Sequence, residues 1–170
     1  DAGMSPDWNI GTGDFTVEWF AYQTETAPGT YPRAFSIGNY ADGASFAVSI
    51  EDGTVYVWIM GNIECEYNYG STEEYIDQWV HYAVTRSSGT VSLYVNGSRH
   101  CTHTEDGEFT NIDTAFQNLW IGREDSEDAT LFPGNITNFH FVNGTALYTA
   151  AELAVPTTTI SPVANSKLLL

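Results

Sequence analysis

The clearest alternation of apolar and polar residues runs from Trp79 to Asn96. A period of two in a segment rich in β-branched and aromatic residues predicts β-strands with one buried face. The pattern predicts two such strands, joined by a Ser-Ser-Gly-Thr connection. We expect their alternating apolar side chains to lie between two sheets: Val80, Val84, Leu93 and Val95.

Shorter runs of the same kind predict further strands. They lie at 15–22, 33–37, 45–51, 54–60, 63–67, 100–104, 119–122 and 135–142, and a last one contains the three leucines at 168–170. Asp52-Gly53 and Asn96-Gly97 are strong hairpin signals. Many short strands at this spacing predict an all-β fold, a two-sheet antiparallel β-sandwich of jelly-roll type. We expect one domain over 1–170, with an N-terminal arm at 1–12 and an extended C-terminal segment at 150–170 that ends in a strand.

The charge narrows the choice of partners. The 170 residues hold five Lys and Arg against 22 Asp and Glu, which gives a formal net charge of −17. Such a surface repels phosphate backbones, so we expect no nucleic-acid partner. The absence of a long apolar run predicts no membrane insertion. The excess of acids is interpreted as solubility in a salty environment, with divalent cation binding as the alternative. Without a basic, apolar leader, the chain is interpreted as a mature product or an excised domain.

Several segments, in order, are similar to laminin G-like domains of the concanavalin A-like lectin/glucanase superfamily. They are Phe15–Phe20 (FTVEWF), Trp79–Arg86 (WVHYAVTR), Leu93–Gly97 (LYVNG), Leu119–Gly122 (LWIG) and Gly134–Tyr148 (GNITNFHFVNGTALY). The last segment also resembles virion and tail-fibre proteins of phages and large algal viruses. The resemblance implies a non-catalytic carbohydrate-binding or adhesion module at an extracellular or virion surface. Its partners would be a glycan, a cell-surface polysaccharide or other virion proteins.

Two alternatives stay open beside that interpretation. The first is a purely structural virion protein, in a capsid or fibre, with no sugar ligand. The second is a glycoside hydrolase, because the superfamily contains such enzymes. Laminarinase-type members carry a Glu-x-Asp-x-x-Glu pattern on one strand, and no segment here matches it. Glu64 and Glu66 share a strand face but lack the third acid. We therefore expect no catalytic residues.

Sugar recognition needs aromatic rings for the apolar face of the sugar and polar side chains for its hydroxyls. Tyr56 and Trp58 are candidates on the middle strands, although Trp58 is expected to lie in the core because tryptophan is usually well buried. The favoured residues are Tyr67 and Tyr69 at a polar strand end, Tyr40 in a Gly-flanked loop, and Arg123 and Asp125 at a loop edge.

The acidic loop at 123–128 is a candidate Ca²⁺ site. Calcium prefers six to eight oxygen ligands, and the loop offers four carboxylates: Glu124, Asp125, Glu127 and Asp128. The alternative is a solvated acidic loop. Many relatives also carry an acid in the closing strand for a structural calcium, and here Asn138 offers only a neutral oxygen.

Two cysteines allow two interpretations. Cys65 and Cys101 each lie in a predicted strand and could form a disulfide between neighbouring strands, which an extracellular location would favour. They could equally be two buried free thiols. Neither has a His or Cys partner at metal-ligand spacing, so a zinc site is not expected.

Overall fold

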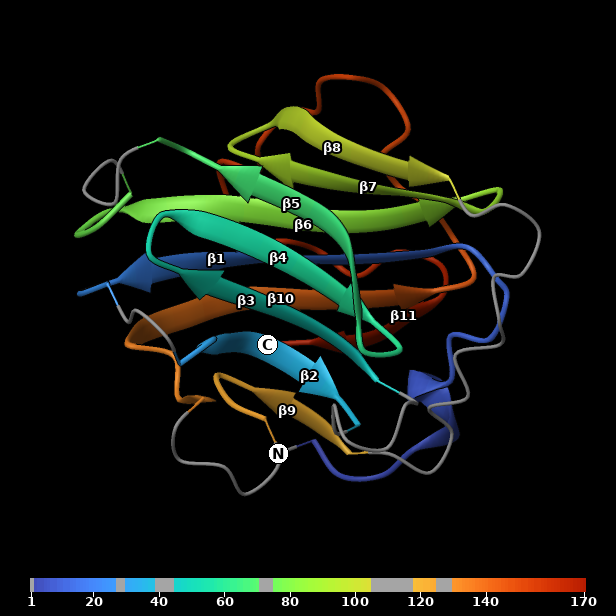
Figure 1. Ribbon diagram of the computed structural model, residues 1–170. Helices are drawn as coiled ribbons and strands as arrows, with labels where there is room; N and C mark the ends of the chain where they lie inside the picture. Colours follow the sequence, from blue (N-terminus) through green and yellow to red (C-terminus); the bar gives the residue numbers. More distant parts are fainter. Residues whose placement is uncertain (1, 27–29, 39–44, 71–74, 105–117, 125–129) are drawn as a thin grey trace.

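The computed structural model describes residues 2–26, 30–38, 45–70, 75–104, 118–124 and 130–170. Within these residues the chain forms two antiparallel sheets, and a short 3₁₀ turn, η1 (Pro6–Trp8), lies near the start. In Figure 1 the five-stranded sheet lies in front of the six-stranded sheet. No helix in the described ranges has the length and apolar character needed to cross a membrane. The predicted all-β sandwich is confirmed.

The strand bounds agree with the expected ranges to within about two residues. The six-stranded sheet contains β1 (Phe15–Gln23), β6 (Trp79–Ser87), β7 (Thr90–Val95), β8 (Ser98–Thr104), β10 (Gly134–Asn143) and β11 (Ser166–Leu169), in the order β11-β10-β1-β6-β7-β8. The five-stranded sheet contains β2 (Arg33–Ile37), β3 (Phe46–Glu51), β4 (Thr54–Ile59), β5 (Asn62–Asn68) and β9 (Leu119–Ile121), in the order β5-β4-β3-β2-β9.

The core lies between the two sheets, where the alternation places the apolar side chains. The four residues predicted to be buried there are at most 1% exposed: Val80, Val84, Leu93 and Val95. Aromatic rings join the sheets across the core. Trp19 of β1 meets Phe35 of β2 edge-on, with ring centroids 5.4 Å apart. This geometry suits the charge distribution of two aromatic rings and adds to the area that they bury.

The outer face of the six-stranded sheet is covered by residues 144–165, which we call the C-terminal cover. The Thr16 hydroxyl of β1 donates to the Thr145 carbonyl, and the Thr85 hydroxyl of β6 donates to the Tyr148 carbonyl. The side chains of β6 that point away from the core, such as His81, are therefore buried as well. The sequence pattern predicted only one buried face here. That part of the prediction is wrong, because the cover comes from a distant part of the chain.

A buried arginine holds the segment that leads into β1. Arg86 donates from Nε to the Gly13 carbonyl over 2.7 Å and from Nη2 to the Gly11 carbonyl over 2.8 Å. Its guanidinium lies 5.2 Å from the centre of the Phe15 ring. A buried cation is stable only when polar groups replace its hydration. The carbonyl groups before β1 serve this purpose, and Arg86 fixes their position in return.

Candidate functional site

A hollow of about 340 Å³ lies between the outer face of the six-stranded sheet and the C-terminal cover. We call it the Trp79 pocket. Its walls combine two aromatic rings with one amide and several hydroxyl groups: Phe20, Trp79, Thr137, Asn138, Pro156, Thr157, Thr158 and Thr159. Ligand pockets of proteins often join an apolar surface to a few polar groups in this way.

The phase of β6 turns Trp79 away from the core. Val80 points between the sheets, so its neighbour Trp79 must point to the outer face. Its ring meets Tyr22 of β1 edge-on, with centroids 5.6 Å apart. The side chain is nevertheless 49% exposed. Phe20, two residues before Tyr22 on β1, lies on the same face, and its ring lines the pocket beside Trp79.

A β-bulge brings Asn138 into the pocket. Glu18 pairs with His140 and Phe20 pairs with Thr137, so β10 has one more residue than β1 between these pairs. Asn138 lies at this bulge. Its φ angle is 51°, a left-handed conformation that asparagine tolerates better than most residues. Within the described chain, no hydrogen bond involves the Asn138 amide group. It is available to a ligand.

The cover supplies the opposite wall of the pocket. Residues 157–159 are three consecutive threonines, and all three are exposed. Their hydroxyl groups form no hydrogen bonds with the part of the chain that the structure describes. Pro156 precedes them and restricts the backbone at their start. The arrangement offers hydroxyl groups on one side and the Trp79 ring and Asn138 amide on the other.

Beside the pocket lies a buried carboxylate with three hydrogen-bond donors. Glu18 accepts from His140 Nδ1 over 2.9 Å, from His81 Nε2 over 3.3 Å and from the Tyr148 hydroxyl over 2.7 Å. Burial raises the pKa of Glu18, but these three hydrogen bonds outweigh it and lower that pKa to about 2. His140 also contacts Ser166 Oγ of β11 at 2.7 Å. The cluster links β1, β6 and β10 to Tyr148 of the C-terminal cover and to β11.

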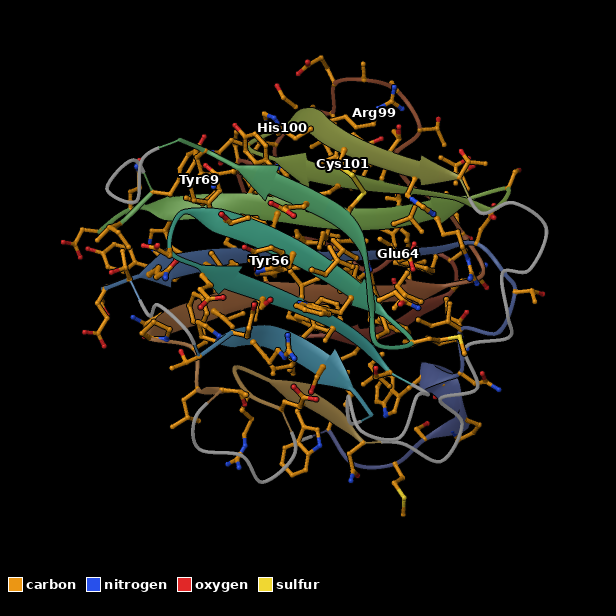
Figure 2. All side chains as sticks on the ribbon, in the orientation of Figure 1. Tyr56, Glu64, Tyr69, Arg99, His100 and Cys101 are labelled. Atoms are coloured by element: carbon orange, nitrogen blue, oxygen red, sulfur yellow. A yellow bond between two sulfur atoms is a disulfide. The ribbon has the colours of Figure 1, made fainter. Side chains whose placement is uncertain are left out.

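Three of the expected sugar-binding residues are described, and they do not all lie together: Tyr67, Tyr69 and Arg123. Tyr67 stacks on His100 with centroids 3.7 Å apart, and the Tyr69 hydroxyl lies 3.3 Å from that of Tyr82. Burial raises the pKa of Tyr69 above its usual range. Figure 2 shows Tyr69 and His100 along the edge where β5 lies beside β8. Both tyrosines serve the packing of that edge.

The other candidates lie at the far edge of the five-stranded sheet or outside the described residues. Arg123 follows β9, and its guanidinium lies 5.3 Å from the Trp120 ring centre. Because β9 and β5 are opposite edges of the sheet, Arg123 is remote from Tyr67. Tyr40 and Asp125 lie outside the residues that the structure describes.

A second group of aromatic rings lies on the outer face of the five-stranded sheet. Trp58, expected in the core, points outward instead, because Val57 and Ile59 on either side of it point inward. Its indole donates to the Ser49 hydroxyl over 2.8 Å. Tyr31 meets the Trp58 ring edge-on, with centroids 5.4 Å apart.

The candidate calcium loop is described only at its start. The Glu124 carboxylate is buried and accepts from Arg33 Nε over 2.7 Å, so it is already paired. Asp125, Glu127 and Asp128 lie outside the described residues. Among the residues that are described, no three His, Cys, Asp or Glu side chains are grouped to hold a metal ion. The calcium site therefore stays a prediction, and Glu124 fits it poorly.

The two cysteines are joined in a disulfide between β5 and β8. These strands are edge strands of different sheets, so the bond joins the two layers. Glu64 on the same edge pairs with His103 of β8 at 3.1 Å, which accounts for one of the two acids considered for catalysis. Glu66 is exposed.

Residues 1–154 match the concanavalin A-like lectin/glucanases superfamily. The chain therefore belongs to this superfamily, and the predicted laminin G-like resemblance is confirmed. A comparison with curated protein sequences found no match.

Solved structures share the fold at low sequence identity. Domains LG4-5 of the mouse laminin α1 chain align with a TM-score of 0.65 and 14% identity, over 85% of this chain and 40% of that one. A SAP-like pentraxin from Limulus polyphemus gives 0.61 and 18%, over 81% and 68% of the two chains. The CBM40 module of a Ruminococcus gnavus sialidase, bound to α2,3-sialyllactose, gives 0.54 and 16%, over 74% and 71%. This chain thus spans less than half of the laminin chain, and the likeness shows a common fold.

Sequence reasoning did not assign the residues of the Trp79 pocket to a sugar site, although a signal for Trp79 was present and Asn138 was considered only for calcium. The alternation that turns Val80 inward also turns Trp79 outward. No comparable signal marks Asn138, because its orientation depends on the bulge in β10. Thr157, Thr158 and Thr159 were expected only as part of the extended C-terminal segment at 150–170.

Proposed function

We propose that this chain is a carbohydrate-binding module and that the Trp79 pocket is its sugar site. The observation that carries the proposal is a half-exposed indole beside an unbonded amide and unbonded hydroxyl groups in one hollow. A sugar ring has an apolar face that stacks on an aromatic ring, and hydroxyl groups that bond to amides and hydroxyls. The superfamily and the saccharide bound by the R. gnavus module support a carbohydrate as the ligand.

We propose that the module is not an enzyme. Among the described residues that line the Trp79 pocket there is no carboxylate, whereas glycoside hydrolysis normally requires a pair of carboxyl groups about 5–10 Å apart. Glu18, which lines the adjacent hollow, has its pKa lowered to about 2 and is held by three donors, so it is a poor proton donor. We expect no release of reducing sugar from laminarin. Release that disappears with Glu64→Gln or Glu66→Gln would contradict this.

We place the module outside the cell or on a virion surface. The Cys65–Cys101 disulfide supports an oxidising location. A structural virion role without a sugar ligand is the competing hypothesis, and the absence of any glycan ligand would favour it.

The test is a glycan array followed by calorimetric titration of the best neutral oligosaccharide. Trp79→Ala should weaken binding at least about tenfold, a free-energy change of about 1.4 kcal/mol, because the stacking surface is removed. Asn138→Ala should also weaken oligosaccharide binding, because the amide group that bonds to a sugar hydroxyl is removed.

The matched control is Tyr31→Ala, which removes another exposed aromatic ring, on the opposite sheet. We expect this variant to bind as the unaltered protein does. Loss of binding in Tyr31→Ala with full binding in Trp79→Ala would move the site to the five-stranded sheet and overturn the assignment.

A further inference from the structure

We infer that the Trp79 pocket selects neutral sugars and excludes sialic acids, uronic acids and sulfated sugars. This inference rests on the proposed sugar site and adds the class of ligand. The lining of the pocket contains two aromatic side chains, one amide, four threonines and a proline. None of these groups carries a positive charge. A carboxylate or sulfate that entered the pocket would lose hydration and find no cation to replace it.

The cations of the chain are all placed, and none lines the pocket. The five Lys and Arg and the four His all fall within the described residues. Lys and Arg have other partners: Arg33 with Glu124, Arg86 with the Gly11 and Gly13 carbonyls, Arg99 with the Thr149 carbonyl, Arg123 over Trp120, and Lys167 with Asp7. A cationic contact to an acidic sugar in this pocket is therefore missing from the structure.

The histidines are no more accessible to a ligand in this pocket. The side chains of His81 and His140 are at most 1% exposed, and each turns a ring nitrogen to Glu18. His100 stacks on Tyr67 and His103 pairs with Glu64, both at the β5–β8 edge. The buried His81 ring also packs against Phe20, with centroids 4.9 Å apart, but none of the four histidines lines the pocket.

The electrostatic field around the pocket is negative and would repel an acidic sugar. Glu18 lies two residues from Phe20 on the same strand face and lines the adjacent hollow, which shares Pro156, Thr158 and Thr159 with the Trp79 pocket. Its three hydrogen-bond donors keep it ionised at neutral pH. The formal net charge of −17 adds repulsion over a longer range. A neutral sugar meets neither penalty and still gains the aromatic stacking and hydroxyl contacts.

The test uses a glycan array of matched pairs, each a neutral oligosaccharide and the same oligosaccharide with a sialic acid, uronic acid or sulfate. Lactose with α2,3-sialyllactose and xylan with glucuronoxylan oligosaccharides are two such pairs. We expect signals that depend on Trp79 from neutral members only, with at least about a tenfold preference at low salt. The preference should become smaller at about 0.5 M NaCl, because salt at that concentration screens exposed charges that lie more than several ångströms apart.

Thr137→Lys provides a matched gain of charge. Thr137 is exposed and lines the pocket, so a lysine there would offer the missing cation. We expect Thr137→Lys to raise the signal of acidic members relative to their neutral partners. The control Glu66→Gln, which raises the net charge by the same one unit on the opposite sheet, should change the ratio less.

The outcomes separate this inference from the proposed function. Acidic members that bind as well as neutral ones, with binding lost in Trp79→Ala, would overturn the neutral selectivity and keep the sugar site. An unchanged ratio in Thr137→Lys would also overturn it. If no glycan of either class gives a signal that depends on Trp79, the sugar site itself fails, and the selectivity with it.

Discussion

At the scale of single residues, Glu18 is a buried carboxylate whose pKa is lowered to about 2. Its carboxylate accepts three hydrogen bonds and joins three strands to the C-terminal cover. The ionised form is favoured because three donors replace the water lost on folding. The native state therefore binds a proton at Glu18 less readily than the unfolded chain does.

Glu18→Gln should remove a pH-dependent part of the stability. The pKa of Glu18 is lowered from 4.5 to about 2, so its contribution is fully present above about pH 5 and disappears as pH falls toward 2. The shift corresponds to about 3 kcal/mol. Urea unfolding at pH 7 and pH 3 should show a smaller pH dependence in Glu18→Gln. The control Glu66→Gln alters an exposed acid and should leave the dependence intact; equal behaviour of the two variants would contradict the account.

Val84→Ala should destabilise the protein by about 1–3 kcal/mol, because it leaves a cavity between the sheets. Val84 is fully buried, and the alternation of β6 predicted its inward orientation. Urea unfolding measures the loss. A change within error would mean that the buried face of β6 is assigned to the wrong side chains.

Two tryptophans show what residue-level prediction achieved. Trp58 was expected in the core from the usual burial of tryptophan, yet the phase of β4 turns it outward. The outward orientation of Trp79 follows from the phase of β6 in the same way. Local phase was the better guide at both positions, because neighbouring side chains on a strand must point to opposite faces.

At the scale of elements, the strands could be predicted but their outer contacts could not. Alternation and turn residues are local, and they place β3, β4, β6 and β7 closely. The Trp79 pocket combines the start of β6, a bulge in β10 and the C-terminal cover. These segments are far apart in the sequence, and no local pattern specifies how they meet. The site therefore required the tertiary structure.

The disulfide between β5 and β8 should be the strongest single link between the two sheets. The Cα atoms lie 5.7 Å apart, and 36 positions separate the cysteines. Closing a loop of this length stabilises a protein by about 3–4 kcal/mol through the unfolded state. The double variant Cys65→Ser, Cys101→Ser should lose that amount in urea unfolding. Reducing agent should shift the unaltered protein to the same midpoint and leave the variant unchanged; no shift in either would contradict the role of the bond.

At the scale of the whole molecule, the formal net charge of −17 opposes the folded state. Acids held close together in the compact state repel one another more than in the unfolded chain. Salt screens this repulsion, so the thermal midpoint should rise from 10 mM to 0.5 M NaCl, over which the Debye length falls from about 30 Å to below 8 Å. A midpoint that stays constant or falls would show that the acidic residues are compensated in the fold.

A calcium site in the 123–128 loop predicts an effect beyond screening. A ligand that binds only the folded state raises the midpoint as its concentration rises. The thermal midpoint in millimolar CaCl₂ should then be higher than the midpoint in NaCl of equal ionic strength, and a chelator should reverse this increase. Equal midpoints, unchanged by Asp125→Ala with Asp128→Ala, would leave the loop as a solvated acidic segment.

The most direct test of the sugar site is the indole N–H spectrum of the five tryptophans, recorded by NMR during titration with a neutral oligosaccharide selected on the array. Single substitutions assign each signal. We predict that the Trp79 signal shifts in proportion to occupancy, because a sugar ring stacks on its indole, while the Trp58 and Trp120 signals on the other sheet stay in place. A titration that shifts Trp58 or Trp120 and leaves Trp79 unchanged would contradict the assignment of the Trp79 pocket as the sugar site.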